Sequence, residues 1–216
     1  MAQPVELVIL DCDGVLVDSE RLAIEIDVAV LADVGWNLTQ EEVVERFVGR
    51  TDAYMLAEVE RHTGKDISDD WYGKYAAVYR EAFDARLAPV PGIEAALDRI
   101  SLPTCVASSG TYERMEFTLG RTDLMSRFEG RITSADDVAH GKPAPDLFLL
   151  AADRMGFDPD VCVVVEDSRS GVEAARAAGM RSLGFSGGVT PAAWLEGPQT
   201  VVFDAMESLP DLIDSL

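Results

Sequence analysis

Two aspartates, Asp11 and Asp13, directly follow a short apolar segment that runs from Val5 to Leu10. The segment is rich in β-branched residues and almost uncharged, as is typical of a strand buried on both faces of a parallel sheet. The two carboxylates then lie at the carboxyl end of that strand, where open α/β sheets bind ligands. Carboxylates this close repel each other unless a cation lies between them or a proton is shared. The pair therefore indicates a metal site, with a solvated acidic turn as the alternative for this fragment taken alone.

Further polar residues stand where three later segments are expected to reach the same edge of the sheet. These residues are Ser108 and Ser109, Lys142, and the pair Glu166 and Asp167. The carboxyl ends of parallel strands share one edge, so we expect these side chains to converge on Asp11. A carboxylate nucleophile, a hydroxyl group, a lysine and an acidic pair together favour phosphoryl transfer.

Four ordered motifs between Val5 and about Gly184 resemble those of the haloacid dehalogenase superfamily, and within it the phosphoglucomutase-like phosphatases with a helical cap. They read DCDGVLVDSE, VASSG, GKPAPDLF and VVEDSRSGVEAARAAGM. The resemblance implies a Mg²⁺ cofactor held by the Asp11 side chain, the Asp13 backbone carbonyl and Asp167, with Glu166 close by. Dehalogenase members do not keep the second aspartate, so Asp13 favours phosphate chemistry.

Each motif residue has a chemical reason for its expected role. Asp11 is the expected nucleophile, and a divalent cation would lower its repulsion from a phosphate dianion. Asp13 would act as general acid and base. Lys142 would neutralise the phosphoryl group and Asp11 together, while Ser108, with Ser109 beside it, would hold phosphoryl oxygens. Mg²⁺ suits this site because it is a hard cation that prefers oxygen ligands.

Composition excludes several classes of function. The 216-residue chain carries a formal net charge of −21, which argues against nucleic-acid binding because phosphate backbones are neutralised by clustered Lys and Arg. No stretch reaches the roughly 18 apolar residues needed to span a membrane, and no signal peptide is evident. We expect a cytoplasmic protein, a monomer or weak homo-oligomer, whose partner is a small phosphorylated metabolite. Cys12, Cys105 and Cys162 are expected to be small buried hydrophobes.

The pattern of elements predicts two domains. Strand and helix patterns alternate outside residues 19–86, whereas only helical patterns occur inside that range. We therefore expect a doubly wound parallel-sheet, Rossmann-like α/β core from residues 1–17 and 88–216, with an inserted four-helix cap at residues 18–87. Thr39 and Glu42 predict a capping box in this insert. The cap would serve as a lid, and Arg46 and Arg50 are its candidate contacts to the substrate.

These observations predict Mg²⁺-dependent hydrolysis of a small phosphate monoester, with a sugar phosphate as the expected substrate, through a phospho-aspartyl intermediate. A hexose phosphomutase is the alternative within the same fold. In the mutases that the chain resembles, a cap histidine and a basic pair occupy positions that here are Ala23, Val48 and Asp52, which favours a phosphatase. A phosphorylatable signalling module is a third possibility, but it needs only about half this length and no lid.

Overall fold

The structure is a computed structural model that describes residues 3–48, 52–64 and 71–216. The chain divides into two compact units, Met1–Asp18 with Ala88–Leu216 and Ser19–Leu87. The second unit is thus an insertion in the sequence of the first. No helix within the described ranges is both long and apolar enough to span a bilayer.

The first unit contains a six-stranded sheet in which every neighbouring pair of strands is parallel. The strands lie in the order β3-β2-β1-β4-β5-β6. Their bounds are β1 Leu7–Leu10, β2 Thr104–Ser108, β3 Ile132–Ser134, β4 Cys162–Glu166, β5 Arg181–Phe185 and β6 Thr200–Phe203. This order confirms the predicted doubly wound, Rossmann-like fold.

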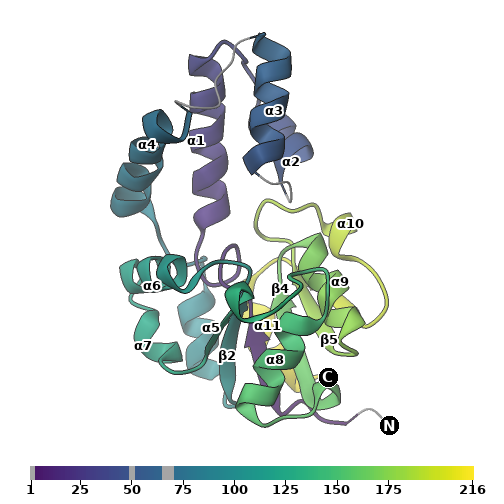
Figure 1. The fold of residues 1–216 in the computed structure, drawn as a ribbon. Helices are drawn as coiled ribbons and strands as arrows, with labels where there is room; N and C mark the ends of the chain where they lie inside the picture. Colours follow the sequence, from purple (N-terminus) through teal and green to yellow (C-terminus); the bar gives the residue numbers. More distant parts are fainter. Residues whose placement is uncertain (1–2, 49–51, 65–70) are drawn as a thin grey trace. The chain divides into compact units, whose positions relative to one another are not determined.

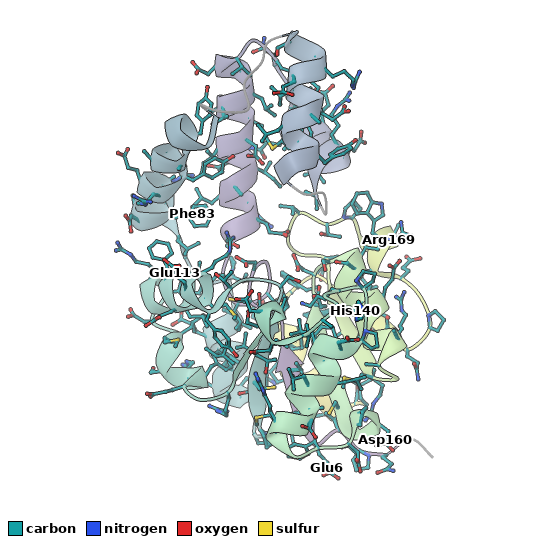
Figure 2. All side chains as sticks on the ribbon, viewed as in Figure 1. Glu6, Phe83, Glu113, His140, Asp160 and Arg169 are labelled. Atoms are coloured by element: carbon teal, nitrogen blue, oxygen red, sulfur yellow. The ribbon has the colours of Figure 1, made fainter. Side chains whose placement is uncertain are left out.

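The order of the strands reverses direction between β1 and β4. The chain proceeds from β1 outward to β2 and β3, and then returns to place β4 on the other side of β1. Helices that connect successive strands diverge at such a point, leaving a crevice at the carboxyl ends of the two central strands. Figure 2 labels Glu6 and Asp160 at the end where β1 and β4 begin, and His140 and Arg169 toward the opposite, carboxyl end.

Helices cover both faces of this sheet (Figure 1). Val8 and Leu10 pack into one apolar cluster with residues of the helices on one face, whereas Leu7 and Ile9 pack into a second cluster with Leu147 on the other. Alternate side chains of β1 are therefore buried on opposite faces. The first face carries α5 (Ile93–Arg99), α6 (Tyr112–Arg121), α7 (Met125–Phe128) and α11 (Leu209–Asp214), the second carries α8 (Asp146–Met155) and α9 (Arg169–Ala177), and α10 (Ala192–Leu195) contacts β5 and α9.

Every strand or helix that the structure describes in the second unit is a helix. Its helices are α1 (Ser19–Asp33), α2 (Gln40–Phe47), α3 (Asp52–Thr63) and α4 (Trp71–Arg86). The predicted capping box at the start of α2 is confirmed: the Glu42 amide donates to Thr39 Oγ1 at 3.2 Å, and the Thr39 amide donates to Glu42 Oε2 at 2.9 Å. Tyr75 donates to Asp33 Oδ2 at 2.6 Å, and this bond ties α4 to α1.

Candidate active site

Lys142 joins the carboxyl ends of three adjacent strands. Its Nζ donates to Asp11 Oδ1 at 2.5 Å, to Glu166 Oε1 at 2.6 Å and to the Ala107 carbonyl at 3.2 Å. These acceptors follow β1, end β4 and lie in β2, respectively. Three acceptors match the three protons of an ammonium group. Although burial acts to lower the pKa of Lys142, Asp11 and Glu166 raise it above its ordinary value, so the side chain stays charged.

Glu166 is held on both of its carboxylate oxygens. Oε1 accepts from Lys142, while Oε2 accepts from the Ser168 amide at 2.7 Å and from the Ser168 hydroxyl at 2.8 Å. Ser168 Oγ also accepts from the Gly171 amide at 3.0 Å, which caps the start of α9. The fully buried Glu166 therefore connects Lys142 to the first turn of that helix.

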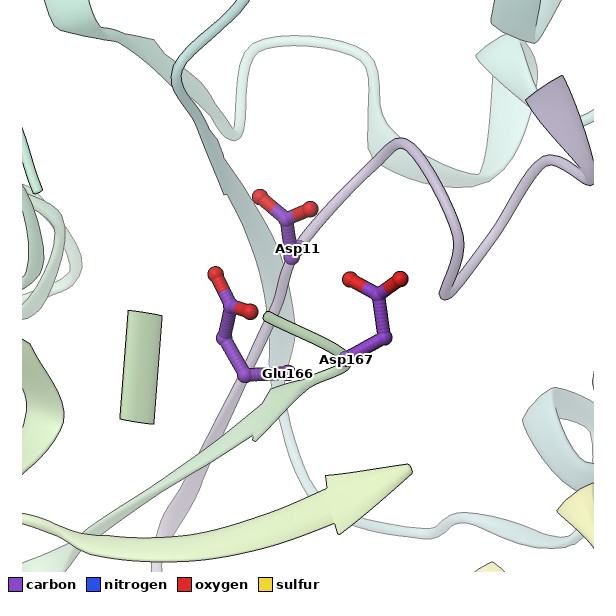
Figure 3. A group of neighbouring side chains, drawn as sticks. All are labelled: Asp11, Glu166 and Asp167. Atoms are coloured by element: carbon purple, nitrogen blue, oxygen red, sulfur yellow. The ribbon is translucent and has the colours of Figure 1, made fainter. Parts of the chain in front are cut away.

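Asp11, Glu166 and Asp167 form a buried acidic cluster (Figure 3). One carboxylate oxygen from each lies within 4.8 Å of the others. Gly14 makes room for Asp167, since it has φ of 79° and a Cβ at this position would lie 2.0 Å from Asp167 Oδ2. The turn after β1 therefore requires glycine both for its left-handed backbone and for the carboxylate beside it.

The charges of this cluster fit a divalent cation. Three carboxyl groups share one ammonium group in this buried site, and negative charge that the ammonium does not balance is unfavourable there without a counter-ion. Burial raises the pKa of Asp11 to about 7, with Glu166 adding to the rise and Lys142 opposing it. Carboxylate oxygens are the ligands that Mg²⁺ prefers. Asp11 and Asp167 are the residues best placed to hold such an ion, because Glu166 already accepts hydrogen bonds on both oxygens.

Ser108 lies at the end of β2 and is buried. Its Oγ accepts from the Gly110 amide at 3.0 Å, so the hydroxyl proton is not used in that contact. The Ser134 hydroxyl donates to the Gly110 carbonyl at 2.8 Å and links this loop to β3. Ser109 is exposed.

Asp13 is paired with Arg114, a residue that the sequence reasoning missed. Arg114 Nη2 donates to Asp13 Oδ1 at 3.0 Å, and Arg114 Nε donates to Asp13 Oδ2 at 3.3 Å. The pair joins residues 101 positions apart in the chain. The available signal was a basic residue six positions after Ser108, at the start of the helix that follows β2.

Arg46 and Arg50 are the candidate substrate contacts of the helical insert, and the structure describes only the first of them. Arg46 lies with its guanidinium carbon 5.7 Å from the centre of the Trp36 ring, a cation–π distance within the second unit. Trp36 also stacks on His62, with ring centres 4.3 Å apart. Arg50 lies outside the described residues. A substrate contact from either arginine remains a prediction.

The three cysteines are buried and form no disulfide. Burial raises the pKa of Cys105 to about 12 and that of Cys162 to about 11, and it also raises the pKa of Cys12. Burial thus favours the protonated form of all three thiols, and the prediction that they are small buried hydrophobes is confirmed.

The doubly wound sheet, with a buried acidic cluster at its switch point, places the protein in the Rossmann-like α/β class. A family model described as haloacid dehalogenase-like hydrolase matches residues 8–185, and the chain belongs to this family. The 6-phosphogluconate phosphatase of Escherichia coli (strain K12) is 30% identical over 209 residues, which cover 96% of this chain and 94% of that protein.

Two crystal structures share the fold over nearly the whole chain. A conserved haloacid dehalogenase-like protein of unknown function from Agrobacterium tumefaciens superposes with a TM-score of 0.89 and 36% identity, covering 98% of both chains. A putative β-phosphoglucomutase from Thermotoga maritima superposes with a TM-score of 0.82 and 28% identity, covering 98% of this chain and all of the other.

Proposed function

We propose that this hydrolase is a Mg²⁺-dependent phosphatase that cleaves a small phosphate monoester, a sugar phosphate, through a phospho-aspartyl intermediate. The observation that carries the proposal is the Lys142 ammonium lying between Asp11 and Glu166, with Asp167 completing a buried acidic cluster. Such a site can receive a negatively charged phosphoryl group only if cations balance the carboxylates. Mg²⁺, held by Asp11 and Asp167, would supply the remaining positive charge and reduce the repulsion between nucleophile and substrate.

In the first step an Asp11 carboxylate oxygen forms a bond to phosphorus, and the bond between phosphorus and the ester oxygen breaks. Lys142 neutralises charge on the transferring group, and the Ser108 hydroxyl donates to a phosphoryl oxygen. Asp13 gives its proton to the departing alkoxide, so the alcohol leaves neutral.

In the second step water attacks the phosphorus of the aspartyl phosphate. Asp13, now ionised, takes a proton from that water as the new bond forms. The bond between phosphorus and the Asp11 oxygen breaks, which regenerates the carboxylate and releases inorganic phosphate. Two steps at one carboxylate thus replace direct attack of water on the ester.

A sugar phosphate is the substrate class that the comparisons favour, because the E. coli relative is named for a phosphorylated sugar acid and aligns along almost its whole length. Phosphatases and mutases share this fold, so the fold alone does not choose between them. The structural neighbour named as a putative β-phosphoglucomutase keeps the hexose phosphomutase as the second candidate. Against it, Ala23 and Val48 occupy positions where the mutases carry a histidine and a basic residue.

The two candidates differ in the fate of the phosphoryl group. Incubation with β-glucose 1-phosphate and a trace of the 1,6-bisphosphate should release inorganic phosphate faster than it forms glucose 6-phosphate. Faster accumulation of glucose 6-phosphate would establish the mutase instead.

The intermediate is tested by mass spectrometry after reaction with acetyl phosphate, which should place the phosphoryl group on the peptide that contains Asp11. Asp11→Asn removes the attacking charge and should abolish both labelling and phosphate release. Labelling of a different residue, or normal turnover by Asp11→Asn, would exclude the mechanism.

A further inference from the structure

We propose that Arg114 is a positioning residue that fixes the carboxyl group of Asp13 for proton transfer to the leaving oxygen. This inference rests on the proposed function, since it assigns the residue that orients the general acid. It concerns a contact that joins the turn after β1 to the first turn of α6.

The geometry of the pair restricts rotation of the Asp13 side chain. Two different nitrogens of one planar guanidinium group contact the two oxygens of one carboxylate, at 3.0 and 3.3 Å. A two-point contact of this kind fixes the plane of the carboxylate, which a single hydrogen bond does not. The Asp13 side chain is 21% exposed, so solvent reaches the carboxylate only in part.

Arg114 is itself held in place by the start of α6. The Arg114 amide donates to Thr111 Oγ1 at 3.2 Å, so the arginine lies in the first, capped turn of the helix. The neighbouring Tyr112 hydroxyl donates to Asp137 Oδ2, and Arg154 Nη1 donates to the same oxygen at 2.7 Å. These contacts anchor the turn that presents Arg114 to Asp13.

The loop before α6 couples this arginine to the expected phosphate-binding serine. A Cβ added at Gly110 would lie 3.4 Å from both Arg114 Cδ and Ser108 Oγ, and 3.8 Å from Asp13 Oδ2. Gly110 thus lies beside all three groups, at ordinary van der Waals distance. The segment after β2 therefore supplies both a phosphate contact and the partner of the acid.

Esters with different leaving groups distinguish a role of Arg114 in positioning the acid Asp13 from its other possible roles. An alkoxide needs a proton as it departs, whereas p-nitrophenolate leaves without one. The value of kcat/KM reports the steps up to and including the first irreversible step, which here is transfer of the phosphoryl group to Asp11. The experiment measures kcat/KM of wild type and Arg114→Ala, with Mg²⁺, on p-nitrophenyl phosphate, glucose 6-phosphate and 6-phosphogluconate. Arg127→Ala is the matched control, because Arg127, on α7, is partly exposed and pairs with Asp98 at 2.8 Å.

We expect Arg114→Ala to lower kcat/KM about 10- to 100-fold for both sugar esters and less than about 3-fold for the aryl ester, since general acid catalysis contributes roughly 10²- to 10⁴-fold. Arg114→Lys keeps the positive charge but cannot contact both carboxylate oxygens through a planar guanidinium group. Its kcat/KM on the sugar esters should therefore lie between those of wild type and Arg114→Ala. In an Asp13→Asn background, Arg114→Ala should cause no further loss, because the two residues act as one unit. Arg127→Ala should have the kcat/KM of wild type on all three esters. Thermal unfolding should show that each variant folds.

Equal losses on all three esters would overturn the proposal, because positioning of the acid acts only where the leaving group needs a proton. A fall in kcat/KM that occurs only with 6-phosphogluconate and comes from a higher KM would also overturn the proposal. It would show that Arg114 binds the carboxylate of that substrate. Failure of wild type to hydrolyse any of the three esters would instead reject the proposed function, and the role of Arg114 with it.

Discussion

The carboxyl group of Glu166 occupies the space that a side chain on residue 171 would need. A Cβ placed on Gly171 would lie 1.8 Å from Glu166 Oε1 and Cδ, far inside van der Waals contact. Glu166 is the residue that holds Lys142 against Asp11. The first turn of α9 therefore determines where the active-site ammonium lies.

Gly171→Ala should consequently destabilise the protein and disturb the site together. Overpacking of a closed interior costs about 1–3 kcal/mol, and displacement of Glu166 would leave Lys142 with one fewer acceptor. The free energy of unfolding in urea and the rate of phosphate release measure the two effects. Gly120→Ala is the control, since Gly120 is also helical and a Cβ there would have nothing within 4 Å; it should be neutral or slightly stabilising. Wild-type stability in Gly171→Ala would contradict the close packing of Glu166 on this turn.

Mg²⁺ should raise the thermal unfolding temperature of wild type, because a ligand that binds only the folded state stabilises it by about 2.7 kcal/mol at 100 times its Kd. Asp167→Asn should lose most of this rise, since it removes one of the carboxylates that would hold the ion. Glu173→Gln removes a carboxylate that pairs with Arg169 on the surface of α9 and should keep the rise. If Mg²⁺ raised the unfolding temperature of Asp167→Asn as much as that of wild type, Asp167 would not be a ligand of the ion.

Lys142→Met should abolish catalysis and destabilise the protein by about 3–5 kcal/mol at neutral pH, because it leaves buried carboxylates without their cation. The folded-state pKa of Asp11 is already raised to about 7, and loss of the ammonium raises it further. An acid whose pKa is higher in the folded than in the unfolded state costs stability at high pH and regains it as the pH falls toward the unfolded value. The deficit of Lys142→Met, measured by urea unfolding against wild type without metal, should therefore be largest at alkaline pH and shrink as the pH falls toward about 7, below which Asp11 is protonated in wild type as well. A deficit that is constant with pH would contradict the charge argument.

Asp137→Asn should destabilise the protein by about 1 kcal/mol or less at pH 7, because it weakens the contacts of Asp137 with Arg154 and Tyr112. Arg154, together with Tyr112, lowers the pKa of Asp137 to about 2. A carboxyl group with a lowered folded-state pKa stabilises the fold above its unfolded pKa, and this stabilisation disappears as the pH falls through the folded value. The stability difference between wild type and Asp137→Asn should therefore be complete near neutral pH and vanish near pH 2. A difference that persisted at that pH would show that the charge of Asp137 is not its source.

The sequence by itself determined the class of fold and the edge of the sheet at which the polar residues gather. Buried parallel strands are short, apolar and β-branched, so their ends could be found from local composition, and polar residues at those ends had to share one edge. The strand β3, Ile132–Ser134, lies at one edge of the sheet. The short helices α7, α10 and α11 were not predicted, because four to six residues give too few turns for a helical period to be recognised.

Only the tertiary structure decided how the polar residues are paired. Lys142 and Asp11 are 131 residues apart, and Arg114 and Asp13 are 101 apart, so no local pattern links either pair. Glu166 lies with Asp11 and Asp167 in the acidic cluster, and the structure adds that its two oxygens accept hydrogen bonds from Lys142 and Ser168. Residue type limits what a side chain can bind, but the partner it does bind depends on which strands and helices the chain packs together. The sequence therefore predicted which residues meet at this edge, and packing decided which of them hold one another.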